Sequence, residues 1–386
     1  MTHESKRHAL TSVSVNLSAI QHNVREILRV THGLPLMAVV KANAYGHGIV
    51  PVAKTALNAG CASLAVVRIE EALELRRARI QKPIVVLSYV SRAISRDVLA
   101  RAIADSIDLV VYDLETAHLL SVLGRRQKKT VRVHLKIDTG TTRVGVLPQA
   151  FMDFFTAITK LPRIQIAGIF THFAESENPK SRVTKKQIQA FQKVKRAIVR
   201  KGKKLPAFHA ASSAALMAHK DSWFDAGRLG IALYGLWPSA EMQRRLSKNI
   251  RLAPALSWHT KILQVKEVPK GTRVSYDGTY TTKRASKIAA LPVGYADGLP
   301  RALSNVGSVL VHGKRAPIRG RICMNLTMID VTNIPAAHVG STVTLLGRDG
   351  REEISAEELA EQDHTINYEI VTRINWELPR FYSKTK

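Results

Sequence analysis

The chain has 386 residues, of which 45% are hydrophobic and 23% charged. This composition excludes wholesale disorder, and the length is sufficient for two domains. Lys and Arg number 58 against 30 Asp and Glu, a formal charge of +28, which would favour an anionic partner.

Eight short apolar runs alternate with amphipathic helical segments over the first 240 residues. The runs are 36–40, 63–67, 84–87, 109–111, 131–137, 164–169, 207–209 and 228–233, and the helical segments include 70–76, 95–107, 113–123, 149–161 and 186–200. Continuous hydrophobicity is typical of strands buried on both faces of a parallel sheet. The pattern predicts an α/β fold with a (β/α)8 barrel over residues 10–248. An open doubly wound sheet is the alternative, but its glycine-rich dinucleotide motif is missing.

Alternating strand patterns replace the helical ones after about residue 248. Strands are expected at 261–265, 274–276, 308–311, 316–318, 327–331 and 342–346, and one helix near 368–375. We therefore predict a mostly β domain over residues 249–386.

The C-terminal ends of barrel strands form the functional face of such folds. Lys41 follows the first run directly, where burial would lower its pKa and make the amine nucleophilic, as a Schiff-base lysine requires. A lysine that extends to solvent is the alternative. The loop 43–48 adds Tyr45 and backbone N–H groups that could hold an anion.

Polar residues also end the fifth and sixth runs. Lys136 and Asp138 lie on one side of the fifth strand and Arg143 follows the turn, either as functional groups or as a structural ion pair. His172 follows the sixth run, and it is either catalytic or structural.

A phosphate site is expected after the last two strands, at Ser212, Ser213 and the backbone of Gly230 and Ile231. Pyridoxal 5'-phosphate needs this site together with a lysine, because it offers a phosphate and an aldehyde. Arg228 can only donate hydrogen bonds, so if it faces the pyridine nitrogen that atom would stay unprotonated. A pyridine ring with an unprotonated nitrogen withdraws electrons less strongly, and this suits a reaction that only removes and returns one α-proton.

Residues 39–48, Val-Val-Lys-Ala-Asn-Ala-Tyr-Gly-His-Gly, resemble the cofactor-lysine motif of alanine racemases. The resemblance continues in order through 136–145, 168–173, 228–235, 274–276, 294–298, 320–324 and 367–369. It implies a pyridoxal-phosphate enzyme with a barrel and a C-terminal β domain. It further implies a head-to-tail homodimer that interconverts L- and D-alanine and supplies D-alanine for peptidoglycan.

The same resemblance implies the residues that act on protons. Lys41 would carry the cofactor and act as the base on one face of the substrate, and Tyr276 of the other subunit would act on the opposite face. A lysine and a phenol are poor bases at neutral pH unless their pKa values are lowered. His172 would orient Tyr276, and Arg228 would face the pyridine nitrogen and contact His172.

The resemblance assigns the other site residues to binding. Phosphate would be held by Tyr45, Ser213, Gly230, Ile231 and Tyr368. Arg143 would contact the phenolic oxygen of the cofactor, braced by Lys136 as N6-carboxylysine. Met324 of the partner subunit would bind the substrate carboxylate, and Tyr295 would narrow the entrance.

Three residues depart from the family pattern, namely Thr141 in place of Met, Asn325 in place of Asp and Ser212 in place of Asn. Because the first two are expected near the substrate, racemisation of another small amino acid such as serine stays open. A barrel-type decarboxylase is also open, although such enzymes tend to place an acid where Arg228 stands.

A nucleic-acid-binding protein on the same scaffold is the alternative of a different class. The basic runs 125–129, 185–186, 193–196 and 200–204 are spread over predicted helices and turns, and no nucleic-acid motif accompanies them. We expect a solvated basic surface, with an amino acid as substrate and neither nucleic acid nor a membrane as partner.

Compartment and metal content are predicted from what the sequence lacks. The sequence contains no apolar run of the roughly 18 residues that a membrane-spanning helix needs. The polar residues 1–7 lack the apolar core of a secretion signal. Cys61 and Cys323 are too few for a disulfide framework and lack zinc-ligand spacing. We expect a cytoplasmic protein that holds no metal.

Overall fold

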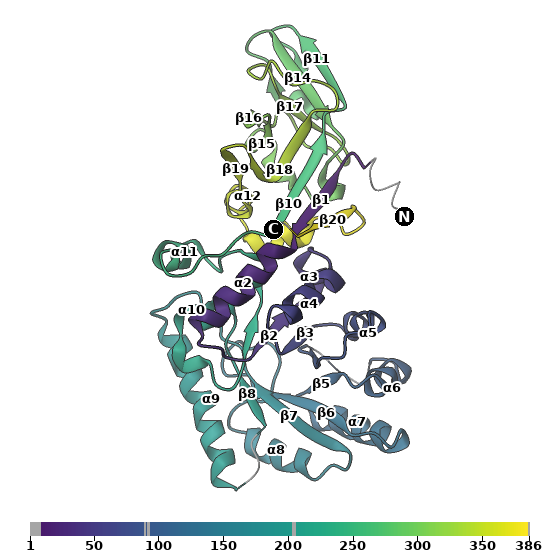
Figure 1. Ribbon diagram of the computed structural model, residues 1–386, viewed down its shortest axis with the longest axis vertical. Helices are drawn as coiled ribbons and strands as arrows, with labels where there is room; N and C mark the ends of the chain where they lie inside the picture. Colours follow the sequence, from purple (N-terminus) through teal and green to yellow (C-terminus); the bar gives the residue numbers. More distant parts are fainter. Residues whose placement is uncertain (1–8, 89, 91–92, 203–205, 385–386) are drawn as a thin grey trace. The chain divides into compact units, whose positions relative to one another are not determined.

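The computed structural model describes residues 9–88, 90, 93–202 and 206–384. The chain forms two compact units (Figure 1). Residues 19–44 and 49–253 make the barrel unit, and residues 9–18, 45–48 and 254–384 make the β-rich unit. The polar start at 1–7 and the last two lysines of the 200–204 run lie outside the described residues.

Eight parallel strands form the sheet of the barrel unit. They are β2 (Leu36–Val39), β3 (Ser63–Val66), β4 (Ile84–Val86), β5 (Asp108–Val111), β6 (Val131–Lys136), β7 (Ile164–Phe170), β8 (Ala207–His209) and β9 (Gly227–Leu229). Their order is β8-β7-β6-β5-β4-β3-β2-β9, and an isolated parallel bridge between His209 and Ala226 joins the two ends. The predicted eight-stranded barrel is therefore confirmed. Strands β2 to β5 are buried along their whole length, which explains the continuous apolar runs.

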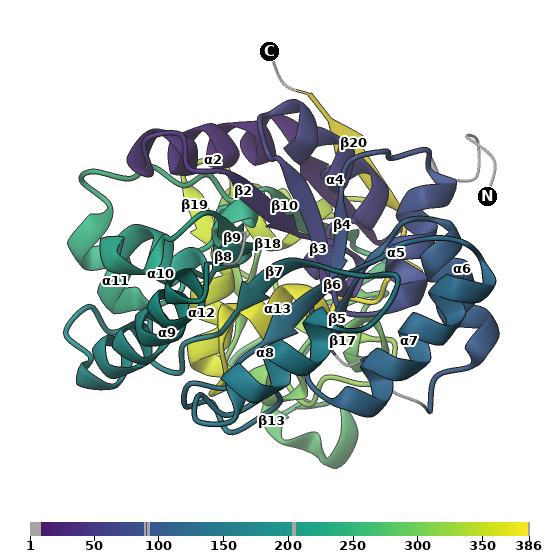
Figure 2. The same cartoon turned by 90° about the horizontal axis from the view of Figure 1, so that it is seen from below.

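Helices surround these strands, as the view along the barrel in Figure 2 shows for α5 to α9. The helices are α2 (Leu17–Val30), which leads into the unit, α4 (Ile49–Asn58), α5 (Ile69–Arg77), α6 (Arg96–Ala104), α7 (Leu114–Arg126), α8 (Phe151–Thr159), α9 (Arg182–Arg200), α10 (Ser213–Ala218) and α11 (Ala240–Leu246). All five predicted helical segments are confirmed within a few residues. Side-chain caps fix several starts: Asp113 accepts from the Thr116 amide and Ser181 from the Thr184 amide.

The prediction of an eighth strand at 228–233 is wrong in its second half, residues 231–233. Strand β9 ends at Leu229, and Ile231–Tyr234 form a 3-10 helix, η2. Gly230 breaks the extended geometry at φ −101° and ψ −109°. Residues 231–234 are nearly completely buried, and a short buried apolar run has the same appearance in a strand and in a helix.

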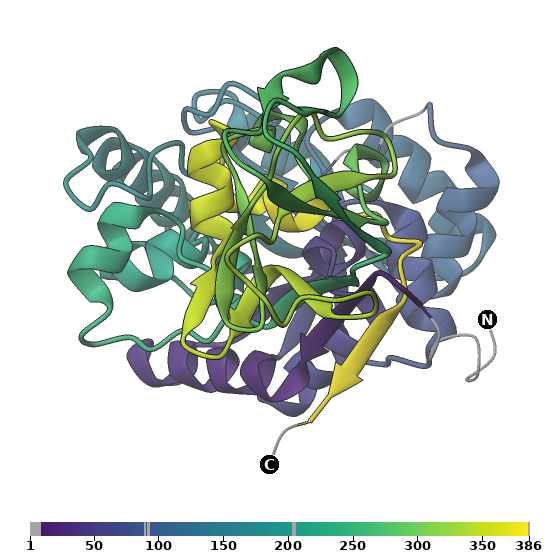
Figure 3. The ribbon, with the colours of Figure 1, turned by 90° about the horizontal axis from the view of Figure 1, so that it is seen from above.

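The β-rich unit contains two larger sheets and a hairpin. One sheet has the order β16-β15-β18-β10-β1-β20, with β19 paired to β18, and the other has the order β11-β14-β17. The strands are β1 (Ser12–Asn16), β10 (Leu256–Lys261), β11 (Gln264–Val268), β12 (Arg273–Val274), β13 (Tyr280–Thr281), β14 (Ser286–Leu291), β15 (Ser308–Val311), β16 (Lys314–Pro317), β17 (Thr327–Asp330), β18 (Thr342–Asp349), β19 (Glu352–Ile354) and β20 (Arg380–Ser383). Figure 3 shows the first strand beside the last, purple against yellow, where β1 pairs in parallel with β20. The predicted mostly β character is confirmed.

Three details of the β-rich unit differ from the sequence expectations. The strand expected at 261–265 is interrupted by a turn at Ile262 and Leu263, which lie between the end of β10 at Lys261 and the start of β11 at Gln264. The strand expected at 274–276 stops at Val274, since Ser275 adopts φ +62°. Near the end of the unit, two helices stand in place of the one expected, α12 (Ala356–Gln362) and α13 (Asn367–Arg373), and strand β20 follows them.

Within the described ranges, no helix has both the length and the apolarity that crossing a bilayer requires.

Asn23 tests the packing of the barrel unit, because this fully buried side chain bonds the backbone at two distant points. It donates to the carbonyls of Leu233 (3.1 Å) and Ala253 (2.9 Å) and accepts from the Ala253 amide (2.8 Å). We expect Asn23→Ala to lower the free energy of unfolding by about 2–4 kcal/mol in denaturant titrations. The control Asn58→Ala, at an exposed position, should change it by less than about 0.5 kcal/mol. Equal effects would contradict this account.

Candidate active site

Five basic side chains gather at the C-terminal ends of the barrel strands. Lys41 follows β2, Lys136 ends β6, Arg143 lies in the loop after it, His172 follows β7, and Arg228 lies in β9. Burial lowers the pKa of His172, and the charges of the other four lower it further, to about 3. The structure therefore brings together the predicted barrel residues that were expected to do chemistry, in a region of concentrated positive charge.

Lys41 lies in the environment that a nucleophilic amine needs. Burial and the charge of Arg143 lower the pKa of Lys41, while Glu71 partly opposes them. Glu71 also holds the backbone around the lysine: it accepts from the amides of Ala42 (2.6 Å), Val67 and Arg68 (both 3.1 Å). In the sequence, Glu71 is marked only by its place in the predicted helix 70–76.

A left-handed helical turn, α3 (Lys41–Tyr45), follows the lysine. Residues 42–45 have φ angles of +51° to +53°, although none is glycine. This conformation costs roughly 1–2 kcal/mol per residue. The Asn43 side chain accepts from the Ile49 amide (2.8 Å) and so links the turn to α4. Backbone strain of this kind is concentrated at functional sites.

Asp138 organises the loop that carries Arg143. Its carboxylate accepts from the amides of residues 140, 141 and 142 at 2.8–3.2 Å and from the Arg143 amide at 2.8 Å. The carboxylate therefore acts on the backbone, and the structural ion pair with Lys136 is not formed in the described part of the chain. Burial, Arg143 and Arg228 lower the pKa of Lys136 to about 8.

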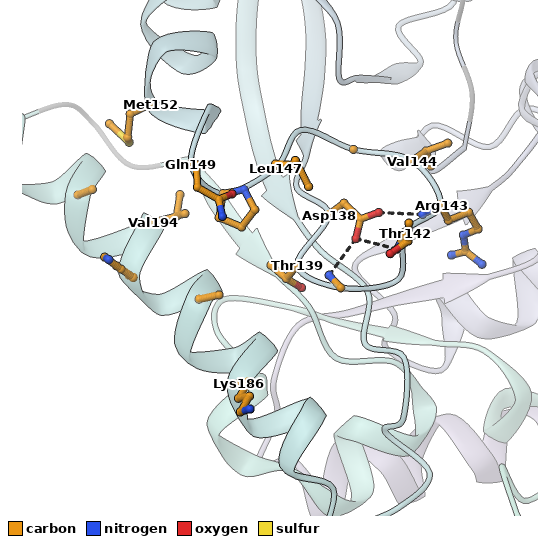
Figure 4. A pocket seen from close by; sticks show the side chains of 16 residues that line it. Asp138, Thr139, Thr142, Arg143, Val144, Leu147, Gln149, Met152, Lys186 and Val194 are labelled. Carbon is orange, nitrogen blue, oxygen red and sulfur yellow. Dashed lines mark hydrogen bonds between the residues drawn. The ribbon is translucent and has the colours of Figure 1, made fainter.

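A cavity of about 820 Å³ lies behind this loop, against α8 and α9 (Figure 4). Its wall includes Asp138, Leu147, Met152, Lys186 and Val194. Of the candidate residues named from the sequence, Asp138 and Arg143 line it in the described structure. The cavity is therefore beside the cluster and does not hold the expected chemistry.

Arg228 is almost fully buried, at 4% exposure, and burial lowers its pKa to about 9. The guanidinium thus stays charged at neutral pH. Nη2 lies 3.3 Å from His172 Nδ1, as the resemblance implied. Both Nη atoms have hydrogen bonds, whereas Nε bonds to none of the described residues.

Ser213 connects the two strand ends expected to bind phosphate. Its Oγ accepts from the Gly230 amide (2.9 Å) and lies 3.3 Å from the Ala232 amide. A hydroxyl that accepts from amides keeps its own proton for donation. Ser212 Oγ lies 3.1 Å from Ser176 Oγ.

The β-rich unit presents a second group of predicted residues. Tyr276 lies on a 3-10 turn, η3 (Tyr276–Gly278), and is 70% exposed, while Tyr295 and Met324 are 43% and 56% exposed. The amides of Tyr295 and Ala296 donate to the carbonyls of Cys323 (3.1 Å) and Met324 (3.0 Å), which joins two of the three segments.

Tyr45 and Tyr368 also belong to this unit. Their ring centroids are 6.2 Å apart. Tyr45 is buried, and burial raises the pKa of its phenol, so it acts as a neutral hydrogen-bonding group. The two rings therefore form a small aromatic pair within the β-rich unit.

Comparison with known proteins agrees with both halves of the chain. Residues 15–238 match the family described as alanine racemase, N-terminal domain, and residues 255–382 match the alanine racemase C-terminal domain. The alanine racemase of Methanococcus maripaludis is 43% identical over 95% of this chain and 97% of its own length. That of Halothermothrix orenii is 44% identical over 96% of each chain.

Solved structures give the same result. Alanine racemase from Bacillus anthracis, with bound L-Ala-P, superposes with a TM-score of 0.90 at 39% identity, covering 98% of this chain and 96% of that one. The enzyme from the D-cycloserine-producing Streptomyces lavendulae gives 0.91 at 35% identity, covering 98% of both chains. The chain is an enzyme that belongs to the alanine racemase family.

Proposed function

We propose that this chain interconverts L- and D-alanine with pyridoxal 5'-phosphate as cofactor and two bases on opposite faces of the α-carbon. The observation that carries the proposal is the cluster of Lys41, Lys136, Arg143, His172 and Arg228 at one end of the barrel. Such a cluster favours a ligand with several negative charges and an amine that is neutral and reactive.

The residues present fit this cofactor. Pyridoxal phosphate supplies an aldehyde for amino groups and a conjugated ring that withdraws electrons from the α-carbon. Lys41 would hold it covalently, and Arg228 Nε is available to donate to the ring nitrogen. Ser213 with the amides of Gly230 and Ile231 would bind the phosphate, as would Tyr45 and Tyr368. Arg143 would contact the phenolic oxygen.

Lys41 would move a proton on one face of the substrate and Tyr276 from a second copy of the chain on the other. A phenol that is 70% exposed in a single chain suits a role completed by another subunit. His172 is neutral, because burial and the nearby positive charges lower its pKa to about 3. Since Arg228 can only donate, Nδ1 of His172 accepts from it and the single ring proton on Nε2 would be donated to Tyr276. We therefore propose a homodimer with shared active sites, in which Met324 binds the substrate carboxylate and Tyr295 narrows the entrance.

Lys136 would carry carbon dioxide as a carbamate. With a pKa of about 8, a substantial fraction of its amine is neutral at physiological pH. The Nζ lone pair attacks carbon dioxide, a C–N bond forms and one amine proton leaves to solvent. The resulting anion would pair with Arg143 and hold it in place.

We take alanine as the substrate and keep serine as the alternative. Thr141 donates its amide to Asp138 and lies in the loop that carries Arg143, so this departure from the family acts close to the proposed site. D-alanine for peptidoglycan is the proposed use of the product. A cytoplasmic location agrees with two free thiols, Cys61 and Cys323.

Chiral analysis of alanine in deuterium oxide tests the proposed reaction. The protein supplied with pyridoxal phosphate should convert L-alanine into D-alanine that carries deuterium at Cα. Lys41→Ala should lower the rate by at least about 100-fold and remove the lysine-bound cofactor absorbance, because base and attachment point are both lost. The control Lys54→Ala, on exposed α4 surface, should leave both unchanged. Carbon dioxide release without D-alanine would instead support a decarboxylase.

Tyr276→Phe separates the two bases. Racemisation in both directions should fall by at least about 100-fold, since a proton can no longer be delivered on that face. Lys41 should still exchange the α-proton of one enantiomer for deuterium from the solvent, and the configuration at Cα should be retained. Tyr280→Phe, whose ring packs on Arg319, is the matched control. Undiminished racemisation in Tyr276→Phe would overturn the two-base assignment.

The Lys136 carbamate is tested with carbon-13 bicarbonate. One carbamate signal per subunit is expected in the carbon-13 NMR spectrum, and it should strengthen as the pH rises through about 8, because the neutral amine reacts. Lys136→Gln should lack the signal, whereas exposed Lys186→Gln should keep it. A wild-type spectrum without the signal at alkaline pH would contradict the modification.

A further inference from the structure

Arg228 is a buried cation without a carboxylate in contact. Nη1 donates to the His209 carbonyl (2.9 Å), and Nη2 donates to the carbonyls of Thr171 (2.7 Å) and Ala210 (2.8 Å). Among the described residues, it forms no ion pair with an acidic side chain. Burying a charge without a counter-charge is costly. The guanidinium has two further contacts, with His172 Nδ1 and with His209 Nδ1, and the second leads to an acid.

The contact between Arg228 and His209 begins a series of hydrogen-bonded, buried side chains inside the barrel. Arg228 Nη1 lies 2.8 Å from His209 Nδ1, His209 Nε2 lies 2.9 Å from His134 Nδ1, and His134 Nε2 lies 3.3 Å from Asp108 Oδ2. His209, His134 and Asp108 are 0%, 4% and 2% exposed. At the far end, Arg132 donates to both carboxylate oxygens of Asp108, at 2.9 and 3.1 Å.

The guanidinium fixes the direction of every hydrogen bond in this chain. Because arginine only donates, His209 Nδ1 must accept, and the proton of neutral His209 is then on Nε2. His134 Nδ1 therefore accepts, and His134 Nε2–H donates to Asp108. Burial and the charge of Arg228 hold the pKa of His209 well below its usual value.

The opposite direction is excluded by the same geometry. If His134 were doubly protonated, its Nδ1–H would donate to His209 Nε2. The proton of His209 would then be on Nδ1 and would face the N–H of Arg228 at a heavy-atom distance of 2.8 Å. Burial alone would raise the pKa of Asp108, but hydrogen bonds from His134 and Arg132 lower it, so this end of the chain is a carboxylate.

The surrounding backbone accommodates this arrangement closely. At Gly168 of β7, a Cβ atom would lie 2.3 Å from His134 Nδ1 and 2.5 Å from Cε1, so any larger residue displaces the ring. Phe170 stacks on His209, with ring centroids 5.0 Å apart and planes 4° apart. The two imidazoles are thus held in one orientation.

We propose that Asp108, His134 and His209 form a directional hydrogen-bond relay that positions Arg228 and supplies its counter-charge through two neutral imidazoles. Asp108, His134 and His209 are positioning residues, because they would act through Arg228, which is the residue that would touch the cofactor. Their effect on the reaction rests on the proposed function, in which Arg228 Nε faces the pyridine nitrogen. Their protonation pattern follows from the geometry whether or not the chain racemises alanine.

Nitrogen-15 NMR of the histidine-labelled full-length protein tests the relay directly, without and with pyridoxal phosphate. Resonances are assigned by loss in His134→Gln and His209→Gln. Both residues should show a protonated Nε2 and an unprotonated Nδ1. Protonated Nδ1 in either residue would overturn the relay, regardless of any measured activity.

Asp108→Asn tests the counter-charge. In the folded variant, the histidine resonances of His134 and His209 should shift, and racemisation turnover should fall about 10-fold or more, as when a group that orients a functional residue is removed. The control Asp105→Asn, at the C-cap of α6 in a surface ion pair with Arg101, should change neither. An unshifted His209 with wild-type turnover would contradict the proposal. If the wild-type protein shows the predicted tautomers but no racemisation, the relay stands and the proposed function fails.

Discussion

The accumulation of buried positive charge at one end of the barrel is the constraint on which the site depends. Lys41 after β2, Lys136 at the end of β6 and Arg228 in β9 share this region with His172. The nearby acids are occupied elsewhere: Glu71 and Asp138 bind backbone amides. Amines in this environment lose protons more readily, and an anionic ligand gains affinity. One electrostatic feature thus supports two parts of the proposed function, a nucleophilic Lys41 and an anionic cofactor.

Charge of this kind has to be stabilised by the scaffold. Asp138 does so indirectly by fixing the Arg143 loop, and the chain from Asp108 does so for Arg228 through the barrel interior. The strained left-handed turn after Lys41 also lowers the stability of the fold and is held by the structure around it. Burial of the apolar strands therefore has to offset the free-energy cost of the buried cations and of the strained backbone.

Much of this arrangement could be predicted from the sequence, because strands buried on both faces leave continuous apolar runs and their ends converge. Lys41 and His172 follow from this reasoning, whereas Arg228 stands at the start of the predicted run 228–233 and is marked by its chemistry and by the family resemblance. The left-handed turn could not be found, since residues 42–45 contain no glycine that signals positive φ. His134 and Asp108 lie within an apolar pattern and at a strand start, and only their contacts in three dimensions reveal the relay.

The most direct test of the account is a high-resolution crystal structure of the protein purified with pyridoxal phosphate. The account predicts continuous density from Lys41 Nζ to the cofactor, with Arg228 Nε at hydrogen-bond distance from the ring nitrogen and Tyr276 of the neighbouring subunit across the substrate site. A cofactor attached to another lysine, or a ring nitrogen turned away from Arg228, would contradict it.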